Sequence, residues 1–250
     1  MIKRITYLVL VSVLFLTGCK DEKDCCVFPE EIITTLNFTH NWNGREITNQ
    51  ELNELKFTTE NGEIISIERL RYLISNLSLV GGDNQFLIDF GENSGTNISL
   101  TDISPGTYNL KFTFGLKNID NKDGEYQLLN SVHFNVPAML GGGYHYMQFD
   151  GKFLNNNDEE TGFNFHAIRA VDRTNPNDLK FEDTSFEVDL GTVEIVKNTT
   201  IEIKMDVSEW FKNPNTWNLN ELHTVLMPNF EAQKMISKNG KSVFTLGKIN

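Results

Sequence analysis

The sequence predicts an all-β protein, built as a single antiparallel β-sandwich with one or two short helices. Short stretches of alternating apolar and polar residues recur along the chain, and turn-forming dipeptides separate them. There is no repeat of the length that builds a solenoid or a propeller. Hydrophobic residues make up 39% of the 250 residues, which is enough for one ordinary core.

Residues 1–18 have the composition of a lipoprotein signal peptide. Lys3 and Arg4 form a basic start, and the apolar run over residues 5–16 is too short to span a bilayer. The segment Leu16–Cys19 resembles the lipobox of bacterial lipoproteins. This resemblance implies cleavage before Cys19 and attachment of lipid to that residue, which would hold the protein to a membrane at about 0.8 kcal/mol per buried methylene.

Residues 19–31 are predicted to be a tether between the lipid and the folded domain. Cys25 and Cys26 are neighbours in sequence, and adjacent cysteines rarely bridge each other without strain, so we expect no disulfide framework. The charged tract over residues 20–24 resembles the surface-export signal of Bacteroidetes lipoproteins. We therefore expect an outer-membrane lipoprotein exposed at the cell surface, with a periplasm-facing orientation as the alternative.

The charge of the chain excludes one class of partner. Residues 1–18 carry two basic groups and no acidic ones, so their removal leaves 20 basic and 34 acidic side chains and a net charge of −14. Nucleic-acid binding requires clustered Lys and Arg side chains against the phosphates. We expect no nucleic-acid partner.

Residues 32–250 are predicted to form the sandwich domain. The first strand covers residues 32–42, and alternation places Leu36, Phe38, His40 and Trp42 on its inner face, where His40 is expected to be a hydrogen-bonded core histidine. Asn61-Gly62 predicts a hairpin turn. Further strands are expected over residues 55–59, 64–67, 86–90, 108–114, 181–190, 193–196, 199–207 and 242–246. Short helices are expected over residues 208–211, with Ser208 as the cap, and over residues 229–237.

The segment from Gly141 to His166 carries the clearest chemical signal. Alternation places His145 and Met147 on one side of an extended chain, and a second strand-like run ends at His166. Two imidazoles and a thioether form a donor set that suits copper better than calcium or magnesium. The alternative from the residues alone is that His145 is exposed, Met147 lies in the core and His166 caps a hairpin.

Motifs of known enzymes are missing from the sequence. It contains no GxSxG, HExxH, Walker A or GxGxxG pattern, and the cysteines all precede residue 27. We expect a binding protein and not an enzyme.

Four segments, in this order, resemble the MbnP-like family of secreted β-sandwich proteins, which is related to the copper-binding MopE type. They are Leu70–Asn76, Pro105–Tyr108, Gly143–Gly151 and Phe163–His166. The resemblance covers roughly residues 33–246, and it implies an extracytoplasmic protein with a di-haem peroxidase-like partner that in some members oxidises a tryptophan. The oxidised residue then binds copper together with histidines, and the histidine that carries over to this chain is His166.

The sequence departs from the family pattern before the Gly143-Tyr144 pair. Residues 136–142 contain no tryptophan, and the three tryptophans lie at Trp42, Trp210 and Trp217. Either His145 or Met147 takes the place of the oxidised tryptophan, or metal binding is lost.

Three functions follow as hypotheses. The first is copper binding or handling by His166, His145 and Met147. The second is a module without metal that presents exposed aromatic rings to a glycan or a protein partner. The third is a redox substrate of a haem partner. The rings considered for the second are Tyr144, Tyr146, Trp210 and Trp217.

Overall fold

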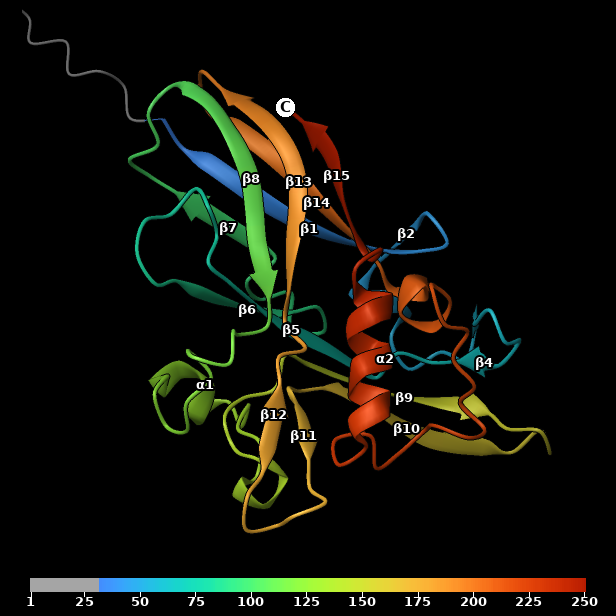
Figure 1. Cartoon of the computed structure of the whole chain (residues 1–250). Coiled ribbons are helices and arrows are strands. Elements are labelled where there is room, and N and C mark those ends of the chain that lie inside the picture. Colours follow the sequence, from blue (N-terminus) through green and yellow to red (C-terminus); the bar gives the residue numbers. More distant parts are fainter. Residues whose placement is uncertain (1–31) are drawn as a thin grey trace, which may run out of the picture. The chain divides into compact units, whose positions relative to one another are not determined.

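The computed structural model describes residues 32–250, so the predicted signal peptide, the tether and Cys19 lie outside the described residues. This part of the chain forms two large sheets and a small two-stranded arm (Figure 1). The first sheet has the order β15-β14-β1-β2, with β7 also paired to β1. Its strands are β1 (Thr34–Trp42), β2 (Arg45–Ile47), β7 (Asn97–Leu100), β14 (Thr199–Asp206) and β15 (Phe244–Ile249).

The second sheet has the order β13-β8-β5-β9-β4-β3, with β10 paired to β9 and β6 paired to β5. Its strands are β3 (Phe57–Thr58), β4 (Ile64–Ile65), β5 (Arg69–Ser75), β6 (Gln85–Asp89), β8 (Gly106–Phe114), β9 (Met147–Leu154), β10 (Glu160–Ala167) and β13 (Phe186–Ile195). The arm consists of β11 (Ala170–Asp172) and β12 (Lys180–Glu182). The helical segments are α1 (Gln127–Ser131), α2 (Phe230–Gly240) and the single 3-10 turns η1 (Asn49–Glu51), η2 (Ala138–Leu140) and η3 (Val207–Phe211).

Aromatic rings join the inner faces of the two sheets into one core. Phe38 of β1 lies 6.1 Å from the Phe112 ring of β8 and 6.4 Å from the Tyr72 ring of β5. Phe244 of β15 packs edge-on against Phe112 at 5.2 Å. Because one hydrophobic cluster is shared by strands of both sheets, the predicted all-β sandwich with short helices is confirmed.

Strand β1 behaves as its alternation predicted, with one difference in pairing. Leu36, Phe38, His40 and Trp42 are all buried. Its neighbour β14 runs parallel to it, with Phe38 opposite Ile203, whereas a wholly antiparallel arrangement was expected. Parallel neighbours need a long crossover connection, and here most of the second sheet provides it.

Side-chain caps, which apolar patterning does not reveal, set two element boundaries. The single strand expected over residues 181–190 is wrong, because the Asp183 carboxylate accepts a hydrogen bond from the Ser185 backbone at 3.0 Å and turns the chain between β12 and β13. Ser208 does not cap η3. The Asp206 side chain does so by accepting from the Ser208 amide at 3.1 Å.

Helix α2 connects the C-terminal region to the end of strand β10. Asn229 caps it by accepting from the Ala232 amide, and the helix continues to Gly240, three residues beyond the predicted end. Gln233, which is 1% exposed, donates to the His166 carbonyl at 2.9 Å and accepts from the Ile168 amide at 2.8 Å. These two hydrogen bonds fix the backbone at the end of β10, where His166 lies.

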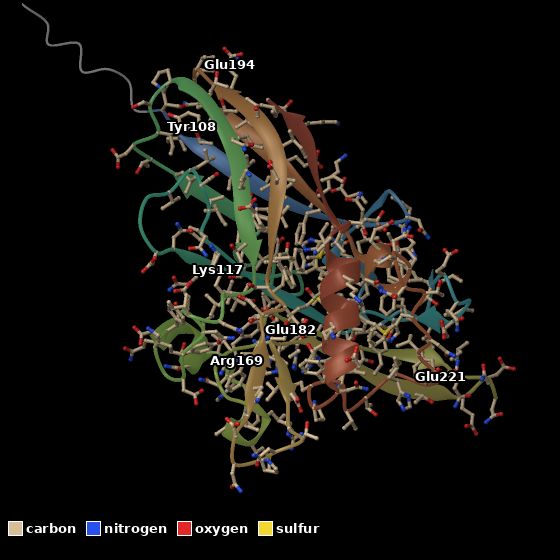
Figure 2. The ribbon with its side chains drawn as sticks, viewed as in Figure 1. Tyr108, Lys117, Arg169, Glu182, Glu194 and Glu221 are labelled. Atoms are coloured by element: carbon tan, nitrogen blue, oxygen red, sulfur yellow. The ribbon has the colours of Figure 1, made fainter. Side chains whose placement is uncertain are left out.

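The base of the arm holds the glycine loop that precedes β9. Figure 2 labels Arg169 and Glu182 in this region. The Arg169 guanidinium lies 4.1 Å from the centroid of the Phe181 ring and donates to the carbonyl oxygens of Asn121 and Gly141. Gly142 has a φ of +64°, and a Cβ there would meet the Asp123 carboxylate. The loop can therefore follow this path only with glycine at that position.

Candidate metal centre

His166 projects from β10 away from the core. Its neighbours Phe163 and Phe165 are buried, and His166 lies opposite Gln148 of β9 in the register. The Nε2 atom is 2.8 Å from Asp150 Oδ1. An ionised carboxylate can only accept, so Nε2 carries a proton, and Nδ1 is the nitrogen that this contact leaves for another partner. Nδ1 is buried and has no hydrogen-bond partner within residues 32–250.

His145 lies just before β9, and the loop after α1 fixes its orientation. Its backbone amide and its Nδ1 both contact the Phe134 carbonyl, at 2.9 and 3.0 Å. A carbonyl oxygen only accepts, so Nδ1 is protonated and Nε2 holds the free lone pair. Nε2 is buried and unpartnered in the described part of the chain. Burial, followed by the proximity of His166, lowers the pKa of His145 to about 4, so the ring is neutral at pH 7.

The two imidazole rings meet edge-to-face, with centroids 5.2 Å apart. Buried polar atoms are nearly always hydrogen-bonded, so unpartnered nitrogens on two adjacent rings require an explanation. Both are basic lone pairs, and in each ring the other nitrogen donates to a fixed acceptor. This is the arrangement in which histidines bind metals, because the outer hydrogen bond fixes the tautomer and the ring orientation. The residues present therefore fit a metal ion held by two nitrogens, each bond being about 2 Å.

Asp150 is the acceptor that fixes His166. Partial burial acts to raise the pKa of its carboxyl group, but hydrogen bonds from His166 and Asn164 and the charge of Arg69 outweigh burial and hold the pKa below its usual value. The Arg69 Nη1 atom is 3.2 Å from Asp150 Oδ2, and the Asn164 amide nitrogen is 2.7 Å from Oδ1. The carboxylate is thus ionised, and the hydrogen bond that it accepts fixes the orientation of the His166 ring.

Gln148 and Arg71 form the wall beside His145. The Arg71 Nε donates to Gln148 Oε1 at 2.6 Å, which turns the Gln148 amide nitrogen toward the His133 carbonyl and the edge of His145. The Arg71 guanidinium also lies 5.4 Å from the centroid of the Phe134 ring. Since His145 Nδ1 donates to Phe134, the 3.4 Å approach of Gln148 to that atom is a packing contact.

Met147 does not belong to this pair, which corrects the sequence prediction. The register sets Met147 opposite Ala167 and Gln148 opposite His166. Facing residues point to the same side of a sheet, so Met147 points to the other side from His166, where it is fully buried in the core. The alternation argument failed because β9 begins at Met147, so His145 lies outside the strand and does not share its parity.

The aromatic residues proposed for surface binding are buried, which is the second correction. Tyr144, Trp210 and Trp217 are 0% exposed and Tyr146 is 1% exposed. The Trp217 ring packs at 4.6 Å from Phe165 and donates to the Leu222 carbonyl. Large rings provide most of the area that a sandwich core buries, and alternation alone does not separate an inner aromatic row from an outer one.

The sequence prediction missed Asp150, Gln148, Arg71 and the Phe134 carbonyl. Asp150 and Gln148 alternate along β9, so they share a face, but only the register with β10 sets that face against His166. The Phe134 contact depends on the bridge between Asn135 and Tyr144, which no local pattern predicts. Within residues 32–250, no three His, Cys, Asp or Glu side chains come together as a metal-binding group.

The fold and the adjacent imidazoles define a β-sandwich protein with a pair of histidines whose unpartnered nitrogens are buried. The family model of MbnP matches residues 31–228 of this chain, and the chain belongs to the MbnP family. Among solved structures, MbnP from Methylosinus trichosporium is similar with a TM-score of 0.49 and 10% sequence identity, over 75% of this chain and 80% of that chain. The comparison with curated proteins finds no match. No helix within residues 32–250 is long and apolar enough to cross a membrane.

Proposed function

We propose that this protein binds copper between His145 Nε2 and His166 Nδ1, as a lipid-anchored protein outside the cytoplasm. The observation that carries the proposal is the pair of buried, unpartnered lone pairs on rings 5.2 Å apart. When bound, copper would supply a one-electron redox centre or a stored ion. The role of the chain is to orient the two imidazoles, through Asp150 for His166 and the Phe134 carbonyl for His145.

The number of donors favours the cuprous ion. Zinc in structural sites takes four ligands, and cupric copper prefers four or more nitrogen and oxygen donors in a tetragonal arrangement. The described part of the chain offers two imidazole nitrogens, with Met147 directed into the core. Cuprous copper accepts two nitrogen donors, so Cu(I) is the form that these residues match.

Location and partner are further parts of the proposal. The lipobox ending at Cys19 and the charged tract behind it support an outer-membrane anchor with the domain at the cell surface, and a periplasm-facing domain is the alternative.

Membership of the MbnP family supports a di-haem peroxidase-like partner. Mass spectrometry of native protein tests that partnership through the masses of peptides containing Trp42, Trp210 and Trp217, where unmodified tryptophan in all three would contradict oxidation by such a partner.

The experiment for copper is a competition titration of the purified full-length protein with Cu(I) against a chromophoric chelator. His145→Ala and His166→Ala each remove one of two nitrogens, and we expect loss of stoichiometric binding in both. His133→Asn is the matched control, because His133 is exposed, lies outside the pair and has a φ of +57°, which asparagine tolerates. Unchanged affinity in both alanine variants would overturn the proposed site.

A further inference from the structure

A second polar site lies at the edge of the first sheet, away from the two-histidine centre. Strands β2 and β7 both pair with β1, at its two ends, and leave a gap between them (Figure 1). A pocket of about 380 Å³ fills this gap. That volume is in the range of sites for small organic ligands.

His40 of β1 lies in the wall of this pocket and is 2% exposed. Its Nε2 is 3.3 Å from the hydroxyl of Tyr72, a residue that is completely buried. The Tyr72 hydroxyl has no other partner in residues 32–250, so it must donate its proton to Nε2 or leave that proton unsatisfied in the core. His40 Nε2 therefore accepts, and the proton of this imidazole resides on Nδ1.

The Nδ1–H of His40 has no acceptor within the described residues, and Nδ1 is not among the fully enclosed unpartnered atoms. The small exposed part of His40 therefore faces the pocket. Burial lowers the pKa of His40 to about 3, so the ring is neutral and presents a single N–H donor. The Phe90 ring, which also lines the pocket, packs on His40 with a centroid separation of 4.5 Å.

The rest of the pocket wall selects against anionic ligands. No lysine or arginine lines this pocket, so an anion would find no cationic partner. Glu46 is the sole carboxylate in the lining. The amides of Asn37, Gln50 and Asn97 also line it, and an amide group both donates and accepts hydrogen bonds. Hydroxyl groups match such a wall because they too donate and accept.

We propose that this pocket binds a neutral, hydroxyl-rich ligand of the size of a monosaccharide or a disaccharide, with His40 Nδ1–H donating to one of its oxygens. Asn37 and Asn97, which are register partners on the outer face of β1 and β7, form the rim of the pocket at the sheet edge, and Glu46 accepts from the ligand's hydroxyls. The site is independent of copper, since none of its residues contacts His145 or His166.

Saturation-transfer NMR on the purified full-length protein tests this proposal with glucose, galactose, mannose, N-acetylglucosamine, lactose and cellobiose as probes. Glucose 1-phosphate serves as the anionic comparison. We expect at least one neutral sugar to give a saturable signal and glucose 1-phosphate to give a weaker one. No signal from any neutral sugar, or a stronger signal from the phosphate, would overturn the proposal.

Two variants place the sugar in the pocket. Asn97→Ala removes an exposed amide from the rim and should weaken the apparent Kd about tenfold, the usual effect of one lost hydrogen bond to a ligand. Ser99→Ala is the matched control, because Ser99 is exposed two residues further along β7 and does not line the pocket. His40→Phe, which removes the donor while retaining a ring, should give a loss of similar size. Unchanged binding in both Asn97→Ala and His40→Phe would mean that the sugar binds elsewhere.

Discussion

Two places in this sandwich bury imidazole rings, and they differ in the ring atom that is left without a partner. At the His145–His166 pair, the N–H groups are satisfied by Phe134 and Asp150 and the lone pairs are free. At His40, the lone pair is satisfied by Tyr72 and the N–H is free. A free lone pair binds a metal cation, whereas a free N–H binds an acceptor atom of a ligand. The partners of a histidine, more than its burial, thus decide its chemistry.

The largest expected effect concerns His40 and the pH dependence of stability. Its pKa in the folded protein is about 3, below the value of 6.5 for an ordinary histidine. Between these pH values the histidine is protonated in the unfolded chain and neutral in the folded protein. The free energy of unfolding is therefore highest well above pH 6.5 and falls as the pH decreases toward 3. Well below pH 6.5 each pH unit costs about 1.4 kcal/mol, and the loss between pH 6.5 and pH 4.5 is about 2 kcal/mol, because the unfolded histidine is already half protonated at pH 6.5.

Urea unfolding of the wild type and of His40→Phe at both pH values measures this effect. We expect the loss of unfolding free energy between pH 6.5 and pH 4.5 to be smaller in His40→Phe by about 2 kcal/mol, because phenylalanine does not titrate in the unfolded chain. Losses of equal size would show that the His40 ring takes up a proton in the folded protein. His40 would then not differ from the His145–His166 pair in the way described above.

The next effect concerns Asp150, which fixes the tautomer of His166. Asp150→Asn replaces an ionised acceptor with a weaker neutral one, so we expect Cu(I) affinity to fall about 10- to 100-fold, as is usual for an outer hydrogen-bond partner of a metal ligand. The competition titration measures it. Asp158→Asn is the control, since Asp158 is exposed in the β9–β10 turn at a φ of +59°, which suits asparagine. Equal affinities for the two variants would remove Asp150 from the centre.

The smallest effect is expected at Met147. Its side chain fills the core on the other side of the sheet from His166, and leucine conserves most of its volume. Met147→Leu should cost less than about 1.5 kcal/mol of unfolding free energy. It should also leave the Cu(I) affinity within about twofold of the wild type, since no sulfur ligand is lost. A loss comparable to that of His166→Ala would restore the thioether as a ligand and contradict the register.

Prediction from the sequence succeeded where local patterns are sufficient. Alternation placed His40 on the inner face of β1, and the structure confirms a core histidine that is hydrogen-bonded to Tyr72. Asn61-Gly62 marked the turn between β3 and β4. The sequence prediction failed at two kinds of place. At Asp183 a side-chain hydrogen bond turns the chain after β12, and at Met147 the register with a distant strand directs the side chain into the core.

The sequence by itself determined the fold class, the strand pattern and the choice of His145 and His166 as candidate metal ligands. Periodicity and residue type are local properties of the chain. Tertiary structure alone decided that Asp150 and the Phe134 carbonyl hold the two rings, that Met147 and the large aromatic rings are buried, and that His40 presents a donor to a pocket. The physical reason is that the proton of an imidazole resides on the nitrogen facing an acceptor. That acceptor is supplied here by strand register and loop closure between distant segments.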